Sequence, residues 1–134
     1  MIAPDTVAAD TNVVVRFLTG DDPEQYQKAH KLFEEKTVFL PDTVLLETAW
    51  VLRYSYDFDK EEIVKAFREL LGLPNIQVND FQLLDNALDW IEDGLDFADA
   101  LHLAFSQEVG IFYTFDKRFS KRSKDKGDCP VKIL

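Results

Sequence analysis

The chain has 134 residues, of which 46% are hydrophobic and 30% charged, and its formal net charge is -10 at pH 7. A chain of this length can bury roughly two thirds of its unfolded surface, so we expect a single domain over residues 1–134 without a disulfide bond, which its one cysteine, Cys129, could not form internally. Because no basic-then-apolar leader opens the sequence and no apolar run approaches the ~20 residues of a membrane span, we expect a soluble, cytoplasmic protein.

Short apolar runs alternate with helical patterns along the whole chain. The predicted elements are, in chain order, strand 6–9, helix 11–18, helix 23–35, strand 37–40, helix 42–56, helix 60–71, strand 76–78, helix 80–92, helix 96–109, strand 111–114, helix 117–122 and strand 131–134. Strands of this length between helices are typical of βαβ units. The sequence therefore predicts an α/β protein with a mainly parallel sheet and helices on both faces.

Polar and turn residues set several of these boundaries. Pro23 suits the first position of a helix, and Asp42 and Asp59 are expected to act as N-caps. Gly20 is expected to end the first helix, and Gly110 is expected to stop the helix that begins near residue 96.

Four acidic residues stand against an apolar background. Asp10 and Asp116 each follow a predicted strand, and ligand sites of parallel sheets gather beyond the carboxyl ends of the strands. Glu47 and Asp99 lie within apolar helical stretches, where an unpaired carboxylate is costly. Four clustered carboxylates would repel one another, whereas Mg²⁺ or Mn²⁺ would turn them into an all-oxygen metal site.

Each acid also has an ordinary structural explanation. Asp10 and Asp116 suit helix caps, and Glu47 suits a helix edge at which its carboxylate reaches solvent. Asp96, on the same helix face as Asp99, has the strongest such explanation, because a carboxylate near a helix start is favourable in any case. Asp99 is expected in the second helical turn, too far from the start to be a simple cap.

The negative net charge argues at first against a nucleic-acid ligand. A bound metal would offset part of it. The basic residues are also clustered near the C-terminus, at Lys117, Arg118, Lys121, Arg122, Lys124 and Lys126. This cluster favours local contacts with phosphates, although a solvated basic surface would look the same in the sequence. Arg16 is a further candidate RNA contact.

Four motifs in this order resemble the PIN-domain nucleases, and most closely their VapC-like toxin branch. They are Ala9-Asp10-Thr11-Asn12, Leu46-Glu47-Thr48-Ala49-Trp50, Asp96-Phe97-Ala98-Asp99-Ala100 and Thr114-Phe115-Asp116-Lys117. The resemblance covers nearly the whole chain. It implies a three-layer α/β/α sandwich with a mainly parallel, roughly five-stranded central sheet.

The resemblance also implies roles for individual residues. Asp10, Glu47, Asp99 and Asp116 would bind Mg²⁺ or Mn²⁺ as the catalytic acids of an endoribonuclease, and Asn12, Asp96 and Thr114 would support them. Such toxins form homodimers and are neutralised by a small antitoxin protein, as one half of a type II toxin-antitoxin pair.

Two other hypotheses compete with the nuclease. A phospho-acceptor domain of the response-regulator type also places acids beyond parallel strands, but it needs an acidic pair after the first strand, where this chain has Asp10 alone. A catalytically idle RNA- or protein-binding PIN-like module would lack part of the acidic quartet, which is complete here.

Overall fold

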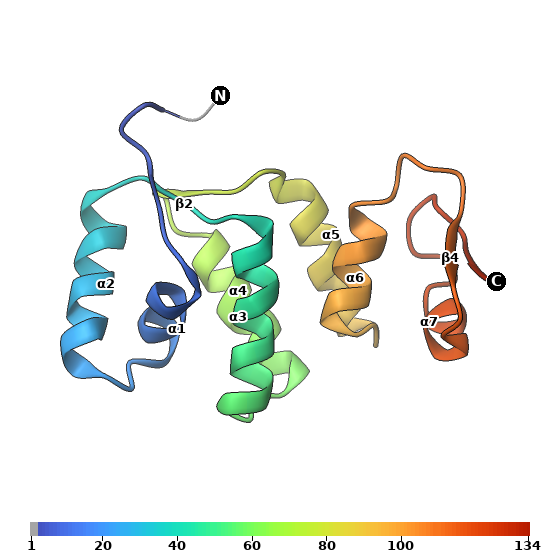
Figure 1. The fold of residues 1–134 in the computed structure, drawn as a ribbon, viewed down its shortest axis with the longest axis horizontal. Coiled ribbons are helices and arrows are strands. Elements are labelled where there is room, and N and C mark those ends of the chain that lie inside the picture. The colour runs from blue at the N-terminus through green and yellow to red at the C-terminus, as the bar shows by residue number, and fades with distance from the viewer. Residues whose placement is uncertain (1–2) are drawn as a thin grey trace. The chain divides into compact units, whose positions relative to one another are not determined.

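The elements of the computed structural model, which describes residues 3–134, follow one another in the predicted order. Figure 1 shows this succession of helices and short strands from the N-terminus to the C-terminus. The chain divides after Asn79 into two units, Met1–Asn79 and Asp80–Leu134, and each is described by itself.

Within residues 3–79, the first unit has three short parallel strands and four helices. Its elements are β1 Val7–Ala8, α1 Thr11–Thr19, α2 Pro23–Glu35, β2 Val38–Phe39, α3 Asp42–Ser55, α4 Lys60–Leu71 and β3 Ile76–Gln77. Strand β2 lies in the centre, because Val38 pairs with Val7 of β1 on one side and with Ile76 of β3 on the other. Fully buried side chains such as Val14, Leu52 and Phe67 form the core.

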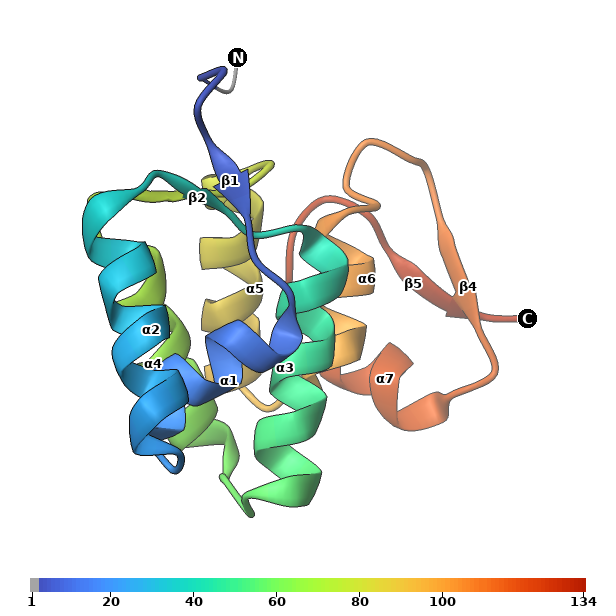
Figure 2. The same ribbon diagram turned by 60° about the vertical axis from the view of Figure 1, so that its left-hand side comes forward.

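The second unit contains two parallel strands and three helices. Its elements are α5 Phe81–Glu92, α6 Phe97–Ala104, β4 Phe112–Thr114, α7 Lys117–Arg122 and β5 Val131–Ile133. Strands β4 and β5 lie side by side, as Figure 2 shows, with Phe112 opposite Val131. The ring of Phe119 from α7 packs edge-on against Phe112 at a centroid distance of 5.5 Å, which joins this helix to the strand.

The α/β class and the parallel pairing of strands are confirmed. The strands among residues 3–134 form a three-stranded sheet in the first unit and a two-stranded sheet in the second, each shorter at its ends than predicted. In this part of the chain, no helix combines the length and the apolar character that crossing a membrane requires.

The helix predicted over 96–109 is shorter. Helix α6 ends at Ala104 with Phe105 as its C-cap, and the chain continues in a tighter turn in which the N–H of Ser106 donates to the carbonyl of Leu103 at 3.1 Å. The hydroxyl of Ser106 donates to the carbonyl of His102 at 2.7 Å, and the amide of Gln107 donates to the carbonyl of Leu103 at 3.0 Å. The chain leaves the helix several residues before Gly110.

The N-cap predicted at Asp42 is wrong by one residue. Helix α3 has Pro41 as its N-cap, so Asp42 is the first helical residue and makes no capping bond. Its Oδ2 instead accepts a hydrogen bond from the side chain of Asn79 at 3.0 Å. The N-cap predicted at Asp59 is confirmed, and with Glu62 it forms a complete capping box.

Candidate functional site

Asp10 lies at the junction of β1 and α1. Two residues beyond the end of β1, it is the N-cap of α1, and its Oδ1 accepts a hydrogen bond from the backbone N–H of Val13 at 3.4 Å. The residue is exposed, and its Oδ2 has no hydrogen-bond partner among the described residues of this unit. The capping role expected of Asp10 is therefore present, and it occupies only one carboxylate oxygen.

Glu47 is exposed on α3, in contrast to the apolar surroundings that the sequence suggested. Its neighbour one turn later, Trp50, is itself 57% exposed, so this face of α3 is not buried within the unit. The buried Thr11 donates a hydrogen bond from its hydroxyl to Oε1 of Glu47. The other oxygen, Oε2, has no partner in the described part of the unit.

This hydrogen bond brings two of the four predicted acids to one place. Thr11 is the residue that follows Asp10, and its side chain holds the carboxylate of Glu47 against the first turn of α1. In the first unit, Asp10 and Glu47 are thus linked through Thr11, just beyond the carboxyl end of β1.

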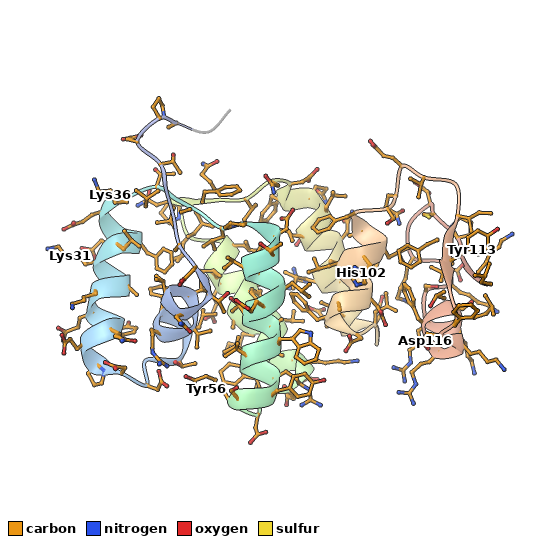
Figure 3. The ribbon with its side chains drawn as sticks, in the orientation of Figure 1. Lys31, Lys36, Tyr56, His102, Tyr113 and Asp116 are labelled. Carbon is orange, nitrogen blue, oxygen red and sulfur yellow. The ribbon has the colours of Figure 1, made fainter. Side chains whose placement is uncertain are left out.

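Asp116 occupies the corresponding junction of the second unit, and Figure 3 shows it at the start of α7. It is the N-cap of that helix, and its Oδ1 accepts hydrogen bonds from the N–H groups of Arg118 at 2.9 Å and Phe119 at 3.1 Å. Thr114 supports the turn, because its hydroxyl oxygen accepts a hydrogen bond from the N–H of Asp116 at 3.0 Å. Asp116 is exposed, and its Oδ2 has no partner among the described residues of the unit.

Asp96 and Asp99 both belong to the start of α6. Asp99 lies in the first helical turn rather than the second and is partly buried. Asp96 is the N-cap of α6, but its side chain makes no capping hydrogen bond. Asp96 therefore lies at the helix start, as the sequence predicted, but its carboxylate makes no capping hydrogen bond there.

The donor chemistry of these acids fits a hard divalent cation. Three of the four, Asp10, Glu47 and Asp116, have one carboxylate oxygen held by a donor of their own unit and the second oxygen unpaired. Mg²⁺ takes oxygen ligands and needs only one or two direct carboxylates beside water and substrate phosphate. Neither unit gathers three or more His, Cys, Asp or Glu side chains into a metal site among its described residues.

The predicted RNA contacts lie in different environments. Lys117, Arg118 and Lys121 are exposed on α7, next to Asp116. Arg122 is exposed as well, but its guanidinium donates to the carbonyl of Gly94 at 3.3 Å. The α7 cations therefore form an exposed basic surface beside one predicted acid.

Arg16 is committed to a network that joins α1, α2 and the end of α3. Its guanidinium donates to Asp21 at 3.0 Å, to the hydroxyl of Tyr56 at 2.8 Å and to Gln25 at 2.7 Å. Hydrogen bonds from Tyr56 and Thr19 hold the pKa of the Asp21 carboxyl below its ordinary value. Burial is the largest single influence on the pKa of Arg16 and lowers it, but the charges of Asp21 and Tyr56 and the hydrogen bonds to both together outweigh burial, so the net shift is upward.

The fold and these junctions define a mixed α/β protein with carboxylates beyond the ends of parallel strands and at the starts of helices. The sequence model described as "PIN domain" matches residues 7–125. The chain belongs to the PIN domain family.

Several known proteins are similar to this chain. A VapC ribonuclease of Aquifex aeolicus (strain VF5) is 27% identical over 121 residues, which cover 84% of this chain and 88% of that protein. The solved structure of VapBC2 from Rickettsia felis, bound to a promoter DNA fragment, has 16% identity and a TM-score of 0.39 over 96% of this chain and 98% of that one. VapC20 of Mycobacterium tuberculosis, a toxin that cleaves the sarcin-ricin loop, has 22% identity and a TM-score of 0.41 over 87% and 93%.

Proposed function

We propose that this PIN-domain protein is a metal-dependent endoribonuclease that hydrolyses RNA phosphodiester bonds. Asp10, Glu47, Asp99 and Asp116 are its proposed catalytic acids. The observation that carries the proposal is the match to the PIN domain over residues 7–125, a range that contains all four acids. In three of them a donor fixes one carboxylate oxygen, and the other oxygen is open to water or a ligand.

The proposal requires the two units to act as one domain. Asp10 and Glu47 belong to the first unit, and Asp99 and Asp116 belong to the second. The match to the PIN domain covers residues 7–125 and so runs across the boundary after Asn79, which supports a single domain assembled from both units.

Mg²⁺ or Mn²⁺ is the proposed cofactor, held by the four acids. When bound, such an ion polarises a phosphate oxygen and lowers the pKa of coordinated water. The protein's own groups then have three tasks. The carboxylates orient the reacting water, one carboxylate oxygen accepts its proton, and Asn12, Asp96 and Thr114 support the acids by hydrogen bonds to them or to water.

The basic surface of α7 is the proposed contact for the RNA backbone. Lys117, Arg118 and Lys121 lie on the helix that Asp116 caps, so phosphates held there would lie near a proposed catalytic acid. Arg122 and Arg16 are weaker candidates, because part of each guanidinium is already engaged.

We further propose that the ribonuclease is the toxin of a type II toxin-antitoxin pair. Similarity to the VapC ribonuclease over most of both chains supports this assignment. By the same resemblance the protein would act in the cytoplasm as a homodimer, and a small antitoxin would bind over the acidic site. We expect a short reading frame for a DNA-binding protein directly upstream. Its product should copurify with this chain and stop cleavage.

A cleavage assay tests the enzymatic part of the proposal. Single-stranded RNA is incubated with the full chain in Mg²⁺, in Mn²⁺ and in excess chelator. Cleavage that depends on the ion is expected. RNA binding without cleavage under every condition would instead identify a catalytically idle binding module.

A further inference from the structure

The hydroxyl of Thr11 is the one side-chain donor on Glu47 among the described residues of the first unit. Thr11 is 6% exposed and begins α1, directly after the N-cap Asp10. A threonine hydroxyl has a single hydrogen to donate, and here it points to Oε1 of Glu47 from a helix distant in sequence.

We infer that Thr11 is a positioning residue for the metal site, acting through Glu47. The inference rests on the proposed function. A glutamate on an exposed helix face samples many rotamers and loses that freedom when it binds a ligand. A hydrogen bond from a buried group to Oε1 restricts those rotamers before the metal arrives and leaves Oε2 as the free ligand atom. Partners of this kind orient metal ligands and raise affinity without touching the ion.

The position of Thr11 links both acids of the first unit. Asp10 uses its own side chain to cap α1, and the next residue reaches across to α3. One turn of helix thereby fixes the spacing between the two carboxylates. A displacement of Glu47 alone would disturb the pair even though Asp10 stays in place.

A purely structural role is the competing explanation, in which the bond only joins α1 to α3. The neighbouring residue Thr48 offers a matched control. It lies on the same helix as Glu47, is 0% exposed, and its hydroxyl has no hydrogen-bond partner among the described residues. Replacing either threonine by valine keeps the shape and removes the hydroxyl, but only Thr11→Val removes a bond to Glu47.

The test measures Mn²⁺ affinity by titration calorimetry for the full chain and for Thr11→Val, Thr11→Ser and Thr48→Val, with thermal midpoints recorded in chelator. Thr11→Val is expected to weaken Mn²⁺ binding roughly 10- to 100-fold. Thr11→Ser, which keeps the hydroxyl, and Thr48→Val should stay close to the wild type. If Thr11→Val does not fold, Thr11→Ala takes its place, because a smaller side chain needs no extra room.

A double-mutant cycle separates positioning from general damage. On a Glu47→Ala background, Thr11→Val should have no further effect on Mn²⁺ affinity, because the acceptor of its hydrogen bond is already removed. Unchanged affinity in Thr11→Val, or an equal loss in Thr48→Val, would overturn the inference while leaving the nuclease proposal intact. A wild-type protein that neither binds Mn²⁺ nor cleaves RNA would overturn both.

Discussion

Asp10 and Asp116 occupy the same structural position in their respective units. Each lies two residues beyond the end of a parallel strand, and each is the N-cap of the helix that follows. Oδ1 of Asp10 accepts one backbone N–H and Oδ1 of Asp116 accepts two, while Oδ2 of each residue is unpaired within its unit. Asparagine caps helices about as well as aspartate, so the charge can be removed at either position without losing the cap.

This equivalence allows a test of whether the two units share one metal site. Asp10→Asn and Asp116→Asn should each weaken Mn²⁺ binding at least tenfold, about 1.4 kcal/mol, with the helical content unchanged. If both carboxylates serve one ion, the double variant should lose little more than either single one, because residues of one site are not additive. Losses that add in full, measured by the same calorimetric titration, would mean that the two acids act at separate places.

The basic surface of α7 predicts a change in salt dependence. Lys117 and Lys121 are exposed and make no ion pair among the described residues. Replacing both by glutamine should weaken the binding of single-stranded RNA and lower the slope of log K against log salt by roughly 1.4, because each neutralised phosphate of a single strand contributes about 0.7 to that slope. Binding is measured by fluorescence anisotropy on an Asp10→Asn background, which prevents cleavage.

The matched control for this experiment is Lys31→Gln with Lys36→Gln. Both lysines are exposed and lie near and just after the end of α2 in the first unit, as Figure 3 shows. Their replacement changes the net charge by the same amount. If the control pair lowers the slope as much as the α7 pair does, the effect comes from overall charge and the α7 surface is only solvated.

The network around Asp21 predicts acid sensitivity. Its folded-state pKa lies below its unfolded-state value, chiefly because Tyr56 donates to it at 2.6 Å. The network therefore contributes stability above the unfolded pKa, near ~4, and loses that contribution as the pH falls through the folded pKa. Tyr56→Phe should lower the urea midpoint at pH 7 and reduce the further loss seen on acidification below about pH 4.

Tyr54→Phe is the control for that measurement. Tyr54 lies on α3, two residues before Tyr56, and is 66% exposed, and its hydroxyl makes no hydrogen bond to the described residues. It should match the wild type at both pH values. Equal behaviour of Tyr54→Phe and Tyr56→Phe would show that the Asp21 network adds nothing to acid stability.

The proposed chemistry also fixes the ends of the products. A water molecule oriented by carboxylates attacks the phosphorus, so the products should carry 5′-phosphate and 3′-hydroxyl ends. A 2′-deoxy substitution at the cleaved nucleotide should leave the cut intact, because the ribose 2′-hydroxyl takes no part. Mass spectrometry of the fragments distinguishes the two kinds of end, and a 2′,3′-cyclic phosphate would contradict the proposal.

The order of helices and strands was predictable because local chemistry marks most boundaries. The carboxylate of Asp59 begins a helix and the left-handed backbone of Gly20, with φ of 63°, ends one, as the sequence suggested. The end of α6 was not predictable in this way, because neither Ala104 nor its C-cap Phe105 is a residue that marks the end of a helix.

Only part of the arrangement around the proposed site was predictable. The sequence placed Asp10 and Asp116 after strands, as the structure has them, because an acid after an apolar run is easily seen. The hydrogen bond from Thr11 was not predicted, since its partner Glu47 lies on another helix and only the folded unit joins them. The sequence offered one signal for this bond. The hydroxyl of Thr11 comes directly after the acid that follows β1, in the first turn of a helix.

The cleavage of single-stranded RNA by the wild type and by Asp10→Asn, compared in the same Mg²⁺ buffer, tests the central proposal most directly. Because asparagine keeps the N-cap of α1, circular dichroism and the thermal midpoint should barely change. Cleavage should fall by several orders of magnitude and should also vanish in the wild type when Mg²⁺ is chelated. A folded Asp10→Asn protein that cleaves RNA at the wild-type rate would contradict the assignment of this carboxylate to the catalytic site.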